Sequence, residues 1–234
     1  MKSLIFFVFI FFAFFTMSCN KSQNEGSGTG DVLIVAKKSG TNTVYGLSIY
    51  AYTFSSFKSV QVDNGDNSTK RYELKSNQGY NTNFYYEAPE IEFTTSKPFA
   101  STYLFSATFE NGASDIFDDI LTDKVLAIPT IDKTEYISAS KELGVSWTPV
   151  AGADSYNINI LDGSTLIYSS PELLNSLKYF AVNPTAIGWL TGFAPVDGKT
   201  YTVRLKAFLY EPSGNSYNMQ AVSMTEKTIV KWGE

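Results

Sequence analysis

The chain has 234 residues, with 18 Lys and Arg against 23 Asp and Glu, one Cys and no His, so its formal net charge at pH 7 is −5. At roughly 150 residues per domain, this length allows one or two compact domains. A net-acidic chain lacks the basic surface that phosphate backbones require, so we expect no nucleic-acid partner. The single Cys excludes an internal disulfide, and the lack of His excludes Ser-His-Asp triads and His-based metal sites. We therefore expect neither an enzyme nor a bound cofactor or metal.

The first 18 residues have the pattern of a targeting segment. Lys2 precedes an apolar run from Leu4 to Phe15, and Ser18 then precedes the lone Cys19. The run has 12 residues, whereas a membrane-spanning helix needs about 20. This arrangement resembles the type II signal peptide of bacterial lipoproteins, in the relaxed form found in Bacteroidetes. The resemblance implies lipidation of Cys19.

A lipidated Cys19 would anchor the chain in the bacterial cell envelope, which we expect to be at the outer membrane. Whether the chain would face the periplasm or the cell surface is left open. The alternative is an ordinary signal peptide that is cut nearby and leaves a free thiol. Residues 19–30 contain no large apolar side chain and are rich in Gly, Ser and Asn, so they are expected to form a flexible tether.

Residues 31–128 are expected to form an immunoglobulin-like β-sandwich. Along residues 44–54 and 101–109, apolar and polar side chains alternate, which is the pattern of half-buried strands. Turn-rich stretches containing Asn, Asp and Gly separate such runs. The segment from Ser114 to Leu121 fits either a helical turn or a final strand of the sandwich.

Pro129 marks the expected boundary to a second sandwich, over residues 129–234, because proline favours extended geometry before an alternating run. The sequence W-x-P-V-x-G-A-D-x-Y begins at Trp147 and ends at Tyr156, and D-G-K-x-Y-x-V-x-L-x-A contains Tyr201. These motifs resemble a fibronectin type III domain. The resemblance implies that Trp147 and Tyr156 pack in the core and that Tyr201 forms a tyrosine corner. The fold class is thus all-β, with two tandem immunoglobulin-like sandwiches.

Two groups of carboxylates are candidates for chemistry. The acidic segment holds Asp115, Asp118, Asp119 and Asp123. It could offer oxygen ligands to calcium, although it lacks EF-hand spacing and fits a solvated acidic turn better. A second group, made of Glu87, Glu90 and Glu92, could pair as acid and base in a small hydrolase, or could be charges at a sheet edge.

Four aromatic residues are candidate ligand-binding residues. Tyr50 and Tyr52 share outward parity, Tyr85 points away from its aromatic neighbours, and Trp189 sits in a Gly-flanked stretch. Exposed rings of this kind can stack on sugars or anchor a protein partner. The alternative for all four is packing, which is also what we expect of Trp232.

These features favour a non-enzymatic, membrane-anchored accessory lipoprotein that displays a binding or scaffolding surface. The layout is similar to that of accessory lipoproteins of Bacteroidetes, some of them encoded with glycan-uptake systems. A glycan-binding component of a polysaccharide-uptake system is the alternative, and a small carboxylate-dependent hydrolase is a third possibility. The expected partners are the membrane, through the lipid anchor, and either a protein or a polysaccharide.

Overall fold

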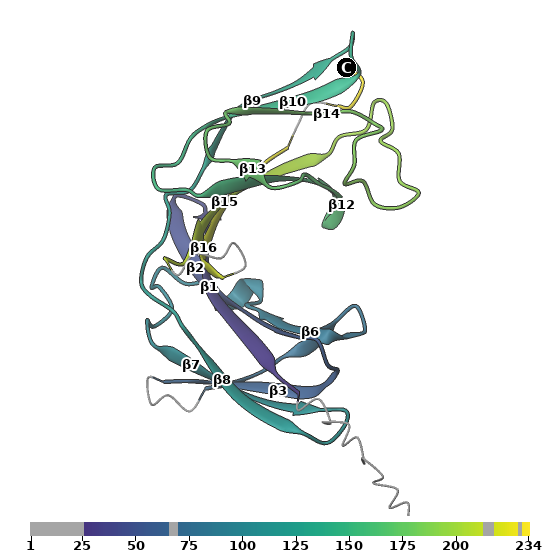
Figure 1. Ribbon diagram of the computed structural model, residues 1–234. Helices are drawn as coiled ribbons and strands as arrows, with labels where there is room; N and C mark the ends of the chain where they lie inside the picture. The colour runs from purple at the N-terminus through teal and green to yellow at the C-terminus, as the bar shows by residue number, and fades with distance from the viewer. Residues whose placement is uncertain (1–25, 66–69, 213–217, 229–230) are drawn as a thin grey trace, which may run out of the picture.

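The computed structural model describes residues 26–65, 70–212, 218–228 and 231–234. Within these residues the chain is built of β-strands, and its helical content is a single 3₁₀ turn, η1 (Glu90–Glu92). No helix in the described part of the chain is long and apolar enough to cross a membrane. The strands enclose two hydrophobic cores, one in each sandwich. The expected all-β class and the tandem immunoglobulin-like sandwiches are therefore confirmed (Figure 1).

The first sandwich packs two four-stranded layers against each other, in the orders β1-β2-β6-β5 and β4-β3-β7-β8. Lettered along the chain, these layers match the ABED and CFG sheets of immunoglobulin domains, with an added C′ strand. The strands are β1 (Gly28–Ser39), β2 (Asn42–Thr53), β3 (Phe57–Asn64), β4 (Arg71–Glu73), β5 (Lys75–Asn77), β6 (Tyr80–Glu87), β7 (Thr102–Phe109) and β8 (Ser114–Ile120).

The alternation in the sequence assigned the faces of these strands correctly. Ile49 and Ala51 of β2 are fully buried against Phe105 and Phe109 of β7 in one core cluster. The segment that fitted either a helical turn or a strand is strand β8, which pairs with β7 in an antiparallel ladder.

Gly28 and Gly30 belong to a strand, so the tether expected over residues 19–30 does not extend as far as residue 30. Gly28 and Gly30 lie in β1 and pair with β2. A Cβ atom at Gly28 would come within 2.2 Å of the Phe117 ring, and one at Gly30 within 2.5 Å of the Phe105 ring. These glycines therefore allow aromatic rings to lie directly on the backbone, a close approach that looks the same in sequence as a flexible linker.

The second sandwich packs a β9-β10-β14 layer against a β12-β11-β15-β16 layer, which is the A-B-E and C′-C-F-G arrangement when lettered along the chain. A short strand, β13, adds to the end of β11. The strands are β9 (Thr130–Ile137), β10 (Glu142–Thr148), β11 (Ser155–Asp162), β12 (Thr165–Ser169), β13 (Leu173–Leu174), β14 (Tyr179–Val182), β15 (Thr202–Tyr210) and β16 (Met219–Thr228).

The aromatic residues of the two fibronectin-like motifs lie in the core of this sandwich. Trp147 and Tyr156 are buried with their ring centroids 5.5 Å apart. Tyr201 is buried, and its hydroxyl accepts a hydrogen bond from the backbone N–H of Val196 at 3.0 Å. This bond to a backbone group just upstream has the geometry of a tyrosine corner. Trp232 is also buried in the same core.

The two sandwiches share one continuous sheet. The last strand, β16, pairs in parallel with the first strand, β1, through Ile34–Ala221, Val35–Val222 and Ala36–Ser223. The result is a nine-stranded sheet in the order β12-β11-β15-β16-β1-β2-β6-β5, with β13 at the side. Figure 1 shows β1, in purple, beside β16 at the waist of a C-shaped molecule. Ala221 of β16 lies in the core of the first sandwich. A strand of the second sandwich therefore contributes a residue to the core of the first. The boundary expected at Pro129 stays a prediction.

Side chains hold this seam on both sides of the strand pair. Met219 donates its backbone N–H to Asp31 Oδ1 at 3.0 Å, and Ser223 Oγ donates to the Leu126 carbonyl at 2.8 Å. The Gln220 amide accepts from the Thr122 hydroxyl at 2.7 Å. Because each bond joins elements that are distant in the chain, the seam is a specific interface.

Two carboxyl-bearing residues at the seam, Asp31 and Asp119, are buried, and a third, Glu211, is partly buried. Asp31 is only 1% exposed, and its Oδ2 atom and Glu211 Oε1 are buried without a hydrogen-bond partner among the described residues. Burial raises the pKa of Asp31 to about 8, against the hydrogen bond from Met219, and the nearby Asp119 and Glu211 carboxylates add to the rise. Burial also raises the pKa of Asp119 and of Glu211. Folding thus favours the protonated form of this group.

Asp31→Asn should stabilise the protein at pH 8 and have little effect at pH 4. The pKa of Asp31 rises from an ordinary 3.8 to about 8 on folding, so its contribution to stability is present below pH 4 and is lost as the pH rises through 8. We expect a gain of about 2 kcal/mol at pH 8, because a pKa unit corresponds to about 1.4 kcal/mol and the site relaxes on ionisation. Urea unfolding at both pH values measures this, with exposed Asp123→Asn as the control. A loss of stability at pH 8 would contradict it.

Tyr201→Phe should destabilise the protein by about 1 kcal/mol, because the substitution keeps the buried ring and removes only the hydrogen bond from Val196. Urea unfolding measures the change, and Tyr80→Phe is the matched control, since Tyr80 is 67% exposed. Equal stability of Tyr201→Phe and wild type would show that the corner bond contributes nothing.

Candidate functional site

The concave face of the nine-stranded sheet carries a trough that crosses the seam. Its central groove, of about 300 Å³, is lined from the first sandwich by Tyr50 and Glu87 and from the second by Lys206 and Phe208. This groove shares Met219 with a neighbouring hollow of about 580 Å³. On its other side it shares Lys37, Glu90, Arg204 and Met224 with a hollow of about 400 Å³. We refer to the three hollows together as the trough.

Two pairs of parallel aromatic rings stand on this face, one in each sandwich. Tyr50 and Tyr52 on β2 have ring centroids 6.3 Å apart and an interplanar angle of 11°. Phe208 and Tyr210 on β15 have centroids 6.5 Å apart and an angle of 1°. Strands β1 and β16 lie between β2 and β15, so the pairs flank the seam. Residues two apart on a strand share a face, which explains why each pair forms.

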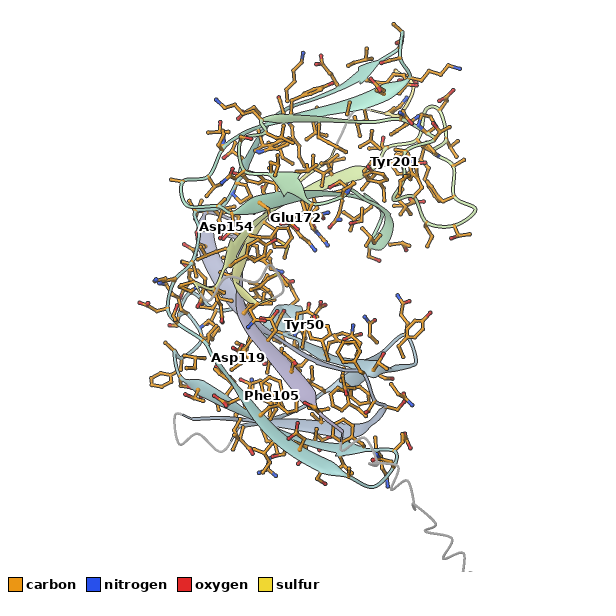
Figure 2. The ribbon with its side chains drawn as sticks, viewed as in Figure 1. Tyr50, Phe105, Asp119, Asp154, Glu172 and Tyr201 are labelled. Carbon is orange, nitrogen blue, oxygen red and sulfur yellow. The ribbon has the colours of Figure 1, made fainter. Side chains whose placement is uncertain are left out.

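A glutamate holds one tyrosine of each pair. The Tyr50 hydroxyl donates to Glu87 Oε1 at 2.8 Å, and the Tyr210 hydroxyl donates to Glu172 Oε1 at 2.5 Å. Figure 2 shows Tyr50 and Glu172 on the two sides of the concave region. Burial and Glu87 raise the pKa of Tyr50, and burial and Glu172 raise the pKa of Tyr210 to about 12. Both hydroxyls therefore stay protonated and keep their rings oriented.

The charged side chains of the trough are mostly paired. Arg204 Nη2 lies 2.6 Å from Glu226 Oε1. Lys37 pairs with Glu90 and also lies over the Phe93 ring, 3.9 Å from its centroid.

The structure places Tyr50, Tyr52 and Tyr85 on the trough side of the sheet, as their parity predicted. Tyr52 is 37% exposed, and burial raises its pKa to about 12. Tyr85 lies opposite Tyr50 in the β2–β6 ladder. Sequence reasoning missed Phe208 and Tyr210, which complete the site. They continue the outward parity of Arg204 and Lys206, so the signal was the alternation carried to the end of the strand.

Trp189 does not join the trough. Its ring packs against Tyr168, Phe193 and Trp232, with centroids 4.8, 5.7 and 5.7 Å away. Its indole N–H donates to the Asn183 carbonyl at 2.9 Å. Both its polar atom and its ring are used within the sandwich, so the geometry favours the packing alternative for Trp189.

The candidate carboxylates are divided among separate partners. Glu87 and Glu90 accept from the trough residues named above, and Glu92 accepts from Lys70 at 2.7 Å and from Tyr86 at 2.8 Å. These two hydrogen bonds lower the pKa of Glu92, which opposes a role as a general acid.

The acidic segment has a structural role in β1. Asp115 accepts the backbone N–H of Gly28 at 2.9 Å, and Asp119 accepts that of Val32 at 2.6 Å. These bonds satisfy the part of β1 that extends past its pairing with β16. Among the described residues, no three His, Cys, Asp or Glu side chains are placed to hold a metal ion. The predicted lipidation site, Cys19, lies outside the described residues.

Comparison with known proteins finds no matching family model and no matching curated protein. Among solved structures, the chain is similar to Tp47, the 47-kilodalton lipoprotein of Treponema pallidum, with 12% identity and a TM-score of 0.38. The match covers 86% of this chain and 49% of Tp47, so the chain spans about half of that protein's length.

Two chicken proteins with fibronectin domains also match. The FN1–FN3 domains of CNTN1 share 14% identity at a TM-score of 0.31, covering 88% of this chain and 66% of that one. A segment of two fibronectin type III domains from tenascin shares 15% identity at a TM-score of 0.25, covering 87% and 100%. None of these likenesses bears on the ligand of this chain.

Proposed function

We propose that this chain is a lipid-anchored, non-enzymatic binding module of a bacterial envelope and that the trough is its ligand-binding face. The observation that carries the proposal is the pair of parallel ring platforms, Tyr50–Tyr52 and Phe208–Tyr210, on one face of a continuous sheet. Aromatic side chains that are oriented before binding lose little rotamer freedom on binding and form typical anchors of interfaces.

A rigid sheet supports this role. Strands β2 and β15, which carry the rings, each have a hydrogen-bonded neighbour on both sides. The ring spacing is therefore set by backbone ladders and by the two tyrosine–glutamate bonds. Such a surface suits the binding of a ligand without rearrangement of the sheet.

The carboxylates of the trough support binding over hydrolysis. Glu87 holds Tyr50, Glu90 pairs with Lys37, and Glu226 pairs with Arg204. A hydrolase of the glycosidase type needs one carboxyl group with a raised pKa and one free carboxylate across a cleft. Glu87, Glu90 and Glu226 instead orient a ring or neutralise cations. Asp31 lines the neighbouring hollow and has a raised pKa, but it is only 1% exposed and its Oδ1 accepts a hydrogen bond from Met219 at the seam.

A glycan is the second candidate for the ligand, and the aromatic pairs favour it specifically. Pyranose rings present flat apolar C–H faces, which stack on aromatic rings, and hydroxyls at their edges, which need hydrogen-bond partners. The trough offers two flat ring surfaces, together with polar side chains such as Ser48 and Lys206 in its central groove. A component of a polysaccharide-uptake system would present such a face outward from its anchor.

Replacing Cys19 by Ser should release the chain from the membrane. Two or three acyl chains add about 0.8 kcal/mol of binding per buried CH₂ group, which is enough to hold a protein of this size permanently. Fractionation of cells into membrane and soluble parts measures this, with globomycin-blocked processing of wild type as the control. If Cys19→Ser stayed in the membrane fraction, the anchor would lie elsewhere.

Tyr50→Ala and Phe208→Ala should each weaken ligand binding at least about tenfold, equivalent to about 1.4 kcal/mol, because each removes half of one ring platform. Affinity electrophoresis through gels containing xylan, pectin, alginate, mannan or mixed-linkage glucan measures retardation. Tyr80→Ala, at an exposed ring outside the trough, is the control. Retardation that survives both trough substitutions would exclude the trough as the binding face, and no retardation in any gel would exclude the glycan candidate.

A further inference from the structure

Of the three cations that line the central groove, Lys206 is the one without a carboxylate partner among the described residues. Lys206 is partly buried on β15, two residues before Phe208, and lines the central groove. Within the described residues, no carboxylate lies within salt-bridge distance of its ammonium group and no hydrogen bond to it is formed. Burial and the nearby Arg204 lower its pKa, while Glu87 raises it. An ammonium group placed in this way is poorly solvated and poorly paired.

Lys206 lines the same groove as Tyr50 and Phe208, one ring of each platform. It lies opposite Met224 of β16 and Asn157 of β11 in the sheet. The groove floor beside it is apolar, formed by Leu33 and Val222, which are 2% and 7% exposed. A ligand that spans the groove from Tyr50 to Phe208 therefore passes Lys206, while the other charged groups beside it, Glu87 and Arg204, are already bonded within the protein.

We propose that the trough binds a glycan that carries a carboxylate, with the Lys206 ammonium group bound to that carboxylate and the two ring platforms stacked on sugars to either side. This inference rests on the proposed function and names the ligand class of the same site. The new bond would be a charge-assisted hydrogen bond from Nζ to a carboxylate oxygen, which is stronger than a neutral one in a poorly solvated groove.

The charge balance of the trough favours a ligand with isolated carboxylates over a densely charged polymer. In the central groove, Arg204 and Lys37 already have glutamate partners, which leaves Lys206 for the ligand. Lys38, which lines the outer hollow, donates to the Thr43 hydroxyl. The chain as a whole carries −5, so its field opposes a polyanion at long range. A polysaccharide in which acidic sugars alternate with neutral ones meets both conditions.

The sheet topology favours a glycan over a peptide. Peptides commonly bind to sheets by adding a strand at a free edge. In the trough, β2 lies between β1 and β6, and β15 lies between β11 and β16. Because both edges of these strands are already paired, a ligand on this face can contact side chains but cannot form a backbone ladder. The parallel pairs of flat rings match the faces of pyranose sugars.

Isothermal titration with hexasaccharides of hyaluronan, alginate and galacturonan tests the proposal, each paired with its carboxyl-reduced, neutral counterpart. We expect the hyaluronan hexasaccharide, in which acidic sugars alternate with neutral ones, to bind wild type at least tenfold more tightly than its neutral counterpart and more tightly than the uniformly charged alginate and galacturonan hexasaccharides. Lys206→Met, which keeps the apolar stem, should remove that difference, and Lys206→Arg should retain it. Lys58→Met, at an exposed lysine on β3 outside the trough, should behave like wild type.

The ligand comparison on wild type needs no variant, so the test holds even if Lys206→Met misfolds. Binding of no acidic hexasaccharide, or equal binding of acidic and neutral forms, overturns the proposal. Tighter binding of a hexaglutamate peptide than of every hexasaccharide also overturns it. Neutral glycans that bind and depend on Tyr50 and Phe208 but not on Lys206 overturn this inference alone. Glycan binding that is indifferent to Tyr50 and Phe208 instead overturns the proposed function.

Discussion

The parallel pairing of β1 with β16 is the interaction on which the rest of the molecule depends. Without it the chain would hold two separate sandwiches joined by a linker, and the faces of β2 and β15 would have no set relation. Three residue pairs and the bonds of Asp31, Gln220 and Ser223 make one sheet of two domains. The parallel direction is possible because β1 and β16 come from opposite ends of the chain, so no short connection has to join them.

The same pairing buries carboxyl groups close to the proposed binding face, and burying their charged forms is electrostatically unfavourable. Extending β1 past the end of β16 leaves backbone N–H groups that Asp115 and Asp119 accept. Asp31 and Glu211 are buried nearby, each with an oxygen that lacks a partner among the described residues. Burying such groups disfavours their charged forms, so the stability of the seam is coupled to pH. The ring platforms lie on the strands next to this seam, and their geometry is set by it.

Alternation of side chains allowed the strands, both sandwiches and the core aromatics to be predicted, because a period of two is a local property that burial on one face imposes. It failed where a residue's role depends on distant contacts. Gly28 and Gly30 fitted a flexible linker because no neighbouring residue in the sequence indicates the Phe117 and Phe105 rings that lie against them. Trp189 in its Gly-flanked stretch fitted either an exposed or a packed ring, and the choice depends on the distant rings of Tyr168 and Trp232, which lie against it.

The sequence by itself determined the all-β class, the inward and outward faces of the strands, and the fibronectin-like framework around Trp147, Tyr156 and Tyr201. It also placed Tyr50 and Tyr52 on an outward face. Only the tertiary structure decided that this face continues into that of Phe208 and Tyr210, because strand order across a sheet is set by long-range pairing. The trough, and the unpaired Lys206 within it, exist only once the two ends of the chain have met.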